Sequence, residues 1–288
     1  NNQKNRTALL TGSTGGIGLE VAKLLAGSGW HLALVNRSKD KAQKQLAELQ
    51  EAHPDQRFTA YAADMMDLAE IRRVTEEVAA QHAELSAIYH IAGLLTDKRM
   101  TSPQGFEGHF AVNTLAPYLI TQRLRKQLSA GSTSEQKSVV VYFSTGAIKG
   151  VKALDVQLLA NPAEIGGLMG AYAKTKLAIT MVMPAQEQAF AEEGILIESV
   201  DPGPTKTPMT SNGDGMPWFI SLLQPILFKS AEVQAQKLVS AVDDAVAANR
   251  TGLFISEGKI KPVPQIVSDK EIQAALITLL DSQVADYR

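Results

Sequence analysis

The sequence predicts one α/β domain, in which a doubly wound, mainly parallel seven-stranded sheet carries helices on both faces. Three observations predict this fold. Short apolar runs alternate with helix-length segments along the chain. The first run opens directly into a glycine-rich turn. The fifth run, residues 139–143, is apolar throughout, as a parallel strand buried on both faces requires. Strands joined by helix-length crossovers form parallel sheets.

Each element follows from its local pattern. We expect strands at residues 7–10, 31–35, 58–62, 87–91, 139–143, 195–200 and 252–255. We expect helices at residues 20–26, 39–51, 68–82, 108–128 and 172–191, and a final helix at 270–288. The loops at 129–138 and 210–217 are rich in Gly, Ser, Asn and Pro but lie between elements. We therefore expect a single domain over residues 1–288.

The composition excludes several kinds of protein. Apolar residues make up 45% of the 288 residues and charged residues 20%, which is typical of globular domains. A net charge of −2 gives no electrostatic reason to bind nucleic acid or an anionic membrane. The absence of cysteine removes disulfides, thiolate nucleophiles and cysteine metal sites, so we expect no metal.

No targeting or membrane-spanning segment is expected. The first six residues are polar and run straight into the first strand, without an apolar signal core. The apolar stretch at 217–228 is interrupted by Ser221, Gln224 and Pro225 and is too short to span a bilayer. We expect a cytoplasmic protein.

The turn after the first strand has the composition of a phosphate-binding loop. Residues 11–18 read Thr-Gly-Ser-Thr-Gly-Gly-Ile-Gly. Glycines there allow a tight turn and a close approach of the backbone to a pyrophosphate, and the amides that open the next helix face the phosphates. Because the turn joins a strand to a helix, it predicts a Rossmann-type dinucleotide site. Ser13 and Thr14 are part of this expected site.

The end of the second strand selects the cofactor. An acidic residue there binds the adenosine ribose, whereas an arginine accepts a 2′-phosphate. This chain has Asn36 and Arg37 at that place and no acid. A guanidinium binds phosphate with two hydrogen bonds. We therefore expect NADP(H) in preference to NAD(H).

A tyrosine and a lysine form the expected acid–base pair. Tyr172 and Lys176 are four residues apart, so they share one face of a helix. A nearby ammonium favours the phenolate, so we expect Lys176 to lower the pKa of Tyr172 and make it a usable acid or base.

With these motifs in order, the sequence resembles the short-chain dehydrogenase/reductase family over residues 7–252, with features of its retinol-dehydrogenase-like branch. The turn matches the family's cofactor motif through Gly12, Gly16, Ile17 and Gly18. Tyr172 and Lys176 match its Tyr-x-x-x-Lys, and the resemblance implies that both contact the cofactor.

Further matches extend the implied cofactor site. Asp64, followed by Met65, resembles the residue that contacts the adenine ring, and Ala92-Gly93 matches half of an Asn-Asn-Ala-Gly segment. The stretch that would meet the nicotinamide carboxamide contains Pro202, Gly203, Thr205 and Thr207. Asn113 falls where the family supports a proton-relay water.

Two departures from the family pattern stand out. The family's substrate-orienting serine is often the second residue of a Ser-Ser pair, and here that pair is Ser144-Thr145. Alignment therefore gives the substrate-orienting role to Thr145, with Ser144 as the alternative. A threonine hydroxyl makes the same hydrogen bonds, but its methyl is stiff and narrows the pocket. His90 stands where the family has asparagine, and we expect a structural role for it rather than proton donation.

The resemblance implies hydride transfer between NADP(H) and a carbonyl or alcohol, with Tyr172 donating the proton and Thr145 or Ser144 binding the oxygen. The alternative is a catalytically idle regulator that senses nucleotide. The resemblance makes residues 208–229 the expected substrate lid. Their apolar side chains favour an apolar or aromatic substrate, or else they pack on the protein or on a neighbouring subunit. The extension at 258–288 covers the domain or contacts another subunit. We expect a homodimer or homotetramer.

Overall fold

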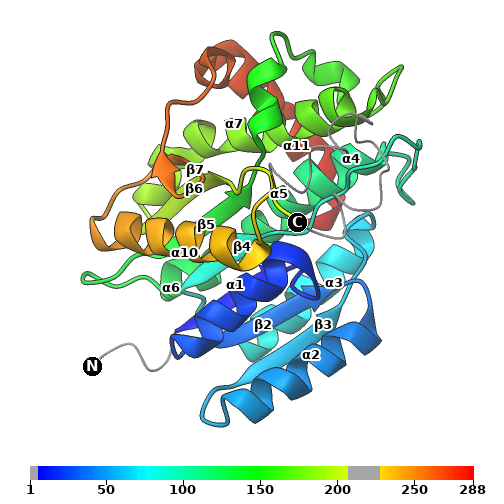
Figure 1. Ribbon diagram of the computed structural model, residues 1–288. Helices are drawn as coiled ribbons and strands as arrows, with labels where there is room; N and C mark the ends of the chain where they lie inside the picture. The colour runs from blue at the N-terminus through cyan, green and yellow to red at the C-terminus, as the bar shows by residue number, and fades with distance from the viewer. Residues whose placement is uncertain (1–5, 207–227) are drawn as a thin grey trace.

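The computed structural model describes residues 6–206 and 228–288. Its strands form one sheet in the order β3-β2-β1-β4-β5-β6-β7-β8. The strands are β1 (Thr7–Thr11), β2 (His31–Asn36), β3 (Phe58–Ala62), β4 (Ala87–His90), β5 (Ser138–Phe143), β6 (Ile195–Asp201), β7 (Phe254–Ser256) and β8 (Lys259–Ile260). The first seven pair in parallel. The predicted fold class is confirmed (Figure 1).

The sheet has one strand more than the sequence predicted. β8 is a two-residue strand that pairs antiparallel with β7 and lies in the C-terminal extension. Both of its residues are exposed, so the alternation of apolar and polar residues that identifies a half-buried strand is missing. A turn at Glu257 and Gly258, both with positive φ, joins the two strands.

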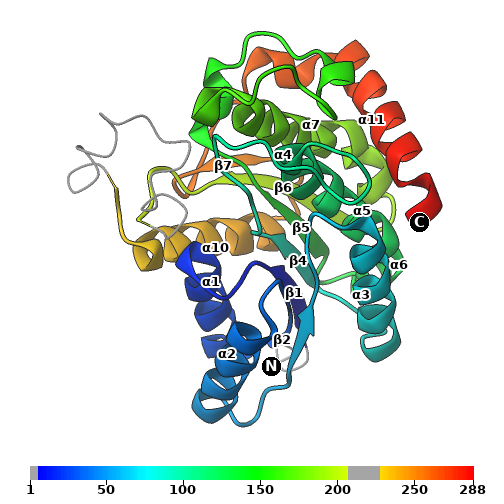
Figure 2. The same cartoon turned by 90° about the vertical axis from the view of Figure 1, so that its right-hand side faces the viewer.

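Helices cover both faces of the sheet (Figure 2). The α-helices are α1 (Gly16–Gly27), α2 (Lys39–Ala52), α3 (Leu68–Gln81), α4 (Gly108–Phe110), α5 (Ala116–Arg123), α6 (Arg125–Ala130), α7 (Ala171–Ala191), α10 (Ala231–Ala247) and α11 (Lys270–Val284). Short 3-10 turns are η2 (Gly146–Gly150), η3 (Val156–Leu158), η4 (Gly167–Met169), η5 (Gln265–Ser268) and η6 (Ala285–Tyr287). Figure 2 shows α1, α2 and α10 on one face, and α3, α5, α7 and α11 on the other.

Each face has its own hydrophobic core because successive side chains of a strand point to opposite sides. In β1, Leu10 packs with α1 and α10, while Leu9 belongs to the larger core under α3, α5, α7 and α11. Capping side chains mark several helix starts: Asp67 accepts a hydrogen bond from the amide of Ala69 at the start of α3.

The helix expected over residues 108–128 is broken. It consists of α4, a π-helical stretch η1 (Ala111–Leu115), α5 and α6, with a non-helical residue at Leu124. Pro117 explains the irregular turn: it has no N–H, so the carbonyl of Asn113 lacks the donor that an α-helix would provide. The sequence prediction of one continuous helix was wrong because it followed apolar content and passed over this proline.

The C-terminal segment packs on the sheet's second layer. Leu276, Leu280 and Val284 of α11 are fully buried against the core that includes α7. The hydroxyl of Tyr118 in α5 donates a hydrogen bond to Asp281 at 2.5 Å. The tail therefore covers this part of the domain. Within the described residues, no helix combines the length and apolar character needed to cross a membrane.

Candidate active site

A cleft of about 910 Å³ opens at the carboxyl ends of the parallel strands. β1 and β4 are neighbours there, so the chain leaves them toward opposite sides of the sheet, and a crevice forms between their ends. The predicted site residues that line the cleft are Gly12, Thr14, Gly16, Ile17, Gly18, Asn36, Arg37, Asp64, Met65, Ala92, Gly93, Ser144, Thr145, Tyr172, Lys176, Pro202, Gly203 and Thr205. Ser13 and Asn113 are buried and are not among the lining residues, and Thr207 lies outside the described residues.

The glycine turn has the shape of a phosphate cradle. Gly12 has a φ of 72°, and a Cβ on it would lie 2.8 Å from the main-chain nitrogen of Ala92. A Cβ on Gly18 would overlap the main-chain oxygen of Gly12. By contrast, nothing lies within 4 Å of a Cβ placed on Gly15, which faces open space in the cleft. The turn therefore lets a large anion approach bare backbone, which fits a dinucleotide pyrophosphate.

A buried polar network holds this turn from below. The amide of Ser13 donates to Oδ1 of Asn36 at 2.8 Å, and Nε2 of Gln45 donates to the carbonyl of Ser13 at 2.7 Å. The hydroxyl of Ser13 also bonds Gln45 at 2.9 Å. The side chains of Ser13 and Asn36 are therefore engaged in shaping the loop. Gln45, which was not predicted, belongs to the same network.

Two cations stand at the end of β2. Arg37 is exposed, and no described residue forms an ion pair with it. Lys41, one turn into α2, lines the same part of the cleft and was missed in the sequence, because an exposed lysine on a charged helix carries no distinguishing signal. Asp64, which follows the neighbouring strand β3, accepts a hydrogen bond from the amide of Met66 at 2.9 Å.

Tyr172 and Lys176 lie at the start of α7 with 8% and 5% of their surfaces exposed. Nζ of Lys176 donates to the carbonyl of Phe143 at 2.7 Å. Burial lowers the pKa of Lys176 to about 8. Burial raises the pKa of Tyr172 to about 12, a hydrogen bond with Thr145 lowers it in part, and the charge of Asp201 raises it further. The expectation that Lys176 lowers the tyrosine's pKa is wrong for the protein alone, because desolvation dominates.

The structure separates the two candidate hydroxyls after β5. The hydroxyl of Ser144 is buried and hydrogen-bonds Thr180 on α7 at 2.7 Å. Thr145 is half-buried and lines the cleft, and its side chain interacts with Tyr172 and lowers the pKa of the phenol. The Thr145 side chain also accepts from the amide of Ala147 at 3.3 Å, which caps η2 and fixes its position. Both residues line the cleft, and Thr145 is the one of the two whose side chain lowers the pKa of Tyr172.

Asn113 is held in the π-helical stretch behind Tyr172. Its Oδ1 accepts from the amide of Leu94 at 2.9 Å, and its Nδ2 donates to the carbonyl of Leu94 at 3.0 Å and to Thr175 at 3.3 Å. The side-chain amide is therefore fully used in joining the loop after β4 to α7. What remains for binding water is the main-chain carbonyl, which Pro117 deprives of its α-helical donor.

His90 has structural surroundings. Nε2 lies 2.8 Å from the hydroxyl of Thr121, and the ring stacks on Tyr142 with centroids 5.2 Å apart. Burial and the nearby charge of Lys176 lower the pKa of His90 to about 3. A histidine that stays neutral at ordinary pH and is bonded within the core matches the structural role that was expected.

The loop after β6 completes the cleft floor. Asp201 accepts from the amide of Gly203 at 2.9 Å and from the hydroxyl of Ser256 at 2.9 Å. Thr205 donates to the carbonyl of Gly203 at 2.9 Å. These bonds fix the loop that was expected to meet the nicotinamide.

The cleft also has an apolar wall. Leu94, Leu95, Met100, Leu168, Met169 and Phe228 line it. The sequence did not indicate this wall, apart from Phe228, since its residues lie in loops and one 3-10 turn without periodicity. Of the predicted lid, residues 208–227 lie outside the described residues.

Comparisons with known proteins agree with this geometry. The short chain dehydrogenase family model matches residues 6–156. Short-chain dehydrogenase/reductase bet4 of Neocamarosporium betae is 25% identical over 93% of this chain and 80% of its own length. Retinol dehydrogenase 13 of Homo sapiens is 24% identical over 94% of this chain and 82% of its own length.

Solved structures show the same fold. The 3-ketoacyl-(acyl-carrier-protein) reductase from Brucella melitensis complexed with NADH has a TM-score of 0.65 at 20% identity, covering 87% of this chain and 96% of that one. The Pseudomonas aeruginosa RhlG/NADP complex has a TM-score of 0.69 at 22% identity, covering 87% and 94%.

Proposed function

This chain belongs to the short-chain dehydrogenase family, and on that premise we propose that it is an NADP(H)-dependent oxidoreductase that reduces a carbonyl or oxidises an alcohol. The observation that carries the proposal is that the side chains of Thr145 and Tyr172 interact in the cleft, with Lys176 one helical turn from Tyr172. Two neighbouring hydroxyls in one cleft can bind one substrate oxygen between them.

The residues divide the work as follows. Tyr172 donates a proton to the carbonyl oxygen during reduction and takes one from the alcohol during oxidation. Thr145 hydrogen-bonds the same oxygen and stabilises the charge that develops on it. The nicotinamide, when bound, supplies or accepts the hydride. Lys176 would leave the carbonyl of Phe143 to hold the nicotinamide ribose, and the main-chain carbonyl of Asn113 would hold the water that restores the proton.

The preference for NADP(H) rests on the cations at the end of β2. Arg37 and Lys41 both line the cleft there, whereas the nearest acidic lining residue along the sheet, Asp64, follows the neighbouring strand β3. A 2′-phosphate would meet two positive charges, whereas the unphosphorylated ribose would lack the carboxylate that usually binds it. The glycine turn would bind the pyrophosphate of either cofactor.

The substrate is proposed to be apolar or aromatic. The wall formed by Leu94, Leu95, Met100, Leu168, Met169 and Phe228 offers apolar contacts beyond Tyr172. Retinol dehydrogenase 13 is named for an apolar alcohol, but its 24% identity leaves this chain's substrate open. A homo-oligomeric state and a cytoplasmic location stay predictions.

The test is NADPH oxidation with a series of aldehydes and ketones of increasing apolar size. Turnover should increase with apolar size, and Tyr172→Phe should reduce it by about 100-fold or more while leaving NADPH binding nearly intact. Tyr61→Phe, which removes a hydroxyl bonded to Gln81 on another part of the sheet, is the control. Tight NADPH binding without turnover of any carbonyl would favour the nucleotide-sensing regulator instead.

A further inference from the structure

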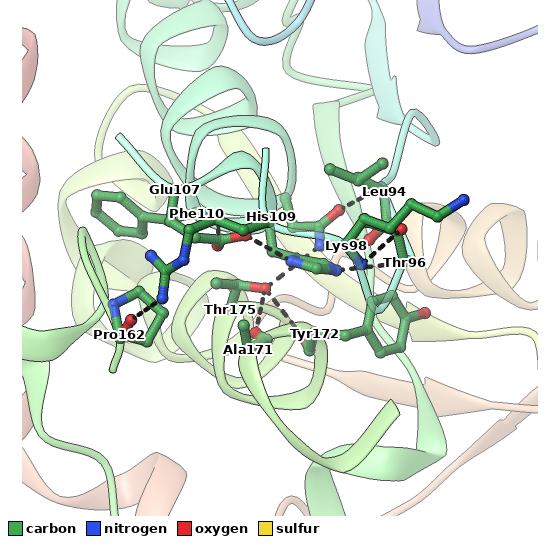
Figure 3. A network of polar contacts seen from close by, with 12 residues as sticks. Leu94, Thr96, Lys98, Glu107, His109, Phe110, Pro162, Ala171, Tyr172 and Thr175 are labelled. Carbon is green, nitrogen blue, oxygen red and sulfur yellow. Dashed lines mark hydrogen bonds and ion pairs between the residues drawn. The ribbon is translucent and has the colours of Figure 1, made fainter. Parts of the chain in front are cut away.

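A buried glutamate and histidine lie directly behind Tyr172. Neither Glu107 nor His109 exposes any side-chain surface. Oε1 of Glu107 lies 2.8 Å from Nδ1 of His109, and Oε2 accepts from the amide of Phe110 at 3.2 Å. The other ring nitrogen, Nε2, lies 3.2 Å from the amide of Thr96. Figure 3 shows the imidazole between these partners, with Tyr172 beside it.

These contacts allow one protonation state of the imidazole. The amide of Thr96 can only donate, so Nε2 of His109 accepts and carries no proton. The carboxylate of Glu107 can only accept, so Nδ1 carries the proton. Bonds from His109 and Phe110 lower the pKa of Glu107 despite its burial, so the carboxylate is ionised. These hydrogen bonds therefore fix the tautomer and the orientation of the His109 ring.

The imidazole fixed in this way contacts the tyrosine. The rings of His109 and Tyr172 lie edge to face, with centroids 6.4 Å apart and an interplanar angle of 73°. Edge-to-face aromatic pairs are favourable and restrict the orientation of both rings. The interaction of Tyr172 with Thr145 therefore depends on the orientation of the phenol ring.

The same network holds the apolar wall of the cleft. Thr96 follows Leu94 and Leu95, which both line the cleft, and its hydroxyl accepts from the amide of Lys98 at 3.1 Å. A Cβ on Gly108 would lie 3.0 Å from side-chain atoms of both Leu94 and Met100, so this loop packs closely on the start of α4. The imidazole of His109 thus connects the loop that carries Leu94 and Leu95 to Tyr172.

We propose that His109, oriented by Glu107, is a positioning residue. It holds the ring of Tyr172 and the loop Leu94–Thr96 in the arrangement used for the reaction. The proposal depends on the function proposed above only because it takes the reaction of Tyr172 to be the oxidoreductase reaction. The ring of His109 sets the orientation of the phenol, and its Nε2 sets the place of the wall.

Two substitutions separate these effects. His109→Gln keeps an acceptor that can reach the amide of Thr96, but it removes the ring and the donor to Glu107. Glu107→Gln keeps the ring, but its amide cannot accept from both His109 and Phe110, so one bond of the network is lost in every arrangement. Glu198→Gln makes the same chemical change at another buried glutamate that does not line the cleft and serves as the control.

The first measurement does not depend on turnover. The protein contains six tyrosines. After labelling with 3-fluorotyrosine, the ¹⁹F resonance of Tyr172 is identified by its loss in Tyr172→Phe. We expect this resonance to shift or broaden in His109→Gln and Glu107→Gln while the other resonances, which report on the intact fold, stay in place. An unchanged Tyr172 resonance in both variants would overturn the proposal, and so would changes spread over all resonances.

The second measurement is steady-state kinetics with NADPH and an apolar ketone. We expect kcat to fall about 10-fold or more in both variants, because a misplaced acid–base group loses its orientation. KM should stay near the wild-type value in His109→Gln, where the bond to Thr96 persists. Wild-type kcat in His109→Gln would overturn the role of the ring. A wild-type protein that reduces no carbonyl would instead contradict the proposed function, and the ¹⁹F experiment would still decide the role of His109.

Discussion

The ammonium of Lys176 donates a hydrogen bond to the main-chain carbonyl of Phe143 at 2.7 Å in a site that is almost closed to solvent. Burial lowers the pKa of Lys176 from 10.5 to about 8. The carbonyl accepts equally from an ammonium and from a neutral amine, so the bond survives deprotonation. At neutral pH the folded protein without cofactor therefore holds the charged ammonium of Lys176 in a buried site, which lowers its free energy of unfolding.

This relationship predicts a pH dependence of stability. Between about pH 8 and 10.5 the unfolded chain holds a proton on Lys176 that the folded protein has lost. The free energy of unfolding should therefore rise with pH in this window by up to about 1.4 kcal/mol per pH unit from this group alone. Below pH 8 this group no longer makes the free energy of unfolding depend on pH, because Lys176 is protonated in both the folded and the unfolded state. Urea unfolding of the protein without cofactor at several pH values measures the effect.

Lys176→Met isolates this contribution from the other groups that titrate in the same window. The difference in free energy of unfolding between wild type and Lys176→Met should change steadily from pH 8 to 10, in favour of the wild type. A difference that stays constant would mean that Lys176 keeps an ordinary pKa.

The hydroxyl that binds substrate is predicted to be that of Thr145. Thr145→Val keeps the shape of the side chain but removes its hydroxyl, so kcat should fall by about 100-fold. Ser144→Ala removes a bond to Thr180 on α7 and should cost about 1 kcal/mol of stability with little change in kcat. Steady-state kinetics and thermal unfolding of both variants check this. The reverse pattern would assign the role to Ser144.

The cofactor preference is predicted to depend on two side chains. Arg37→Ala and Lys41→Ala should each weaken NADPH binding by about 10-fold, and NADH binding by much less, because only NADPH carries the 2′-phosphate. Lys39→Ala is the control, since Lys39 is equally exposed but does not line the cleft. Titration calorimetry with NADPH and NADH gives, for each of the two variants, the dissociation constant relative to that of the wild type. Equal losses for NADPH and NADH would contradict phosphate recognition.

Local patterns predicted most of the fold. Seven strands and most of their helices follow from apolar runs, glycine turns and helical amphipathicity, which depend on neighbours in the chain, but α10 (Ala231–Ala247) between β6 and β7 was not predicted. The broken helix at residues 108–130 was missed because apolar content hides the effect of Pro117 on the carbonyl four residues earlier. β8 was missed because a two-residue exposed strand has no periodicity.

The candidate site was predictable only in part. Arg37, Tyr172 and the glycines stand at fixed distances from the strands that position them. Lys41 and the Glu107–His109 pair reach the site through tertiary packing that no spacing in the sequence records. The pKa of Tyr172 could not be foreseen either, because it depends on burial, which a lysine four residues away does not determine.

A last prediction concerns Glu198, buried in the middle of β6. One oxygen accepts from the amide of Leu253 at 2.9 Å, and the other has no hydrogen-bond partner among the described residues. Burial raises the pKa of Glu198 from 4.5 to about 9, so the folded protein holds a proton there that the unfolded chain has lost. The stabilisation is therefore complete below pH 4.5 and disappears as the pH rises through about 9.

Glu198→Gln imitates the protonated acid at every pH. The variant should match wild-type stability within about 1 kcal/mol at pH 5, because the amide oxygen can still accept from Leu253. At pH 9 it should be clearly the more stable of the two, because only the wild type must bury or neutralise a carboxylate. Urea unfolding at pH 5, 7 and 9 tests this, and a stability difference independent of pH would show that Glu198 is ionised in the folded protein with an ordinary pKa.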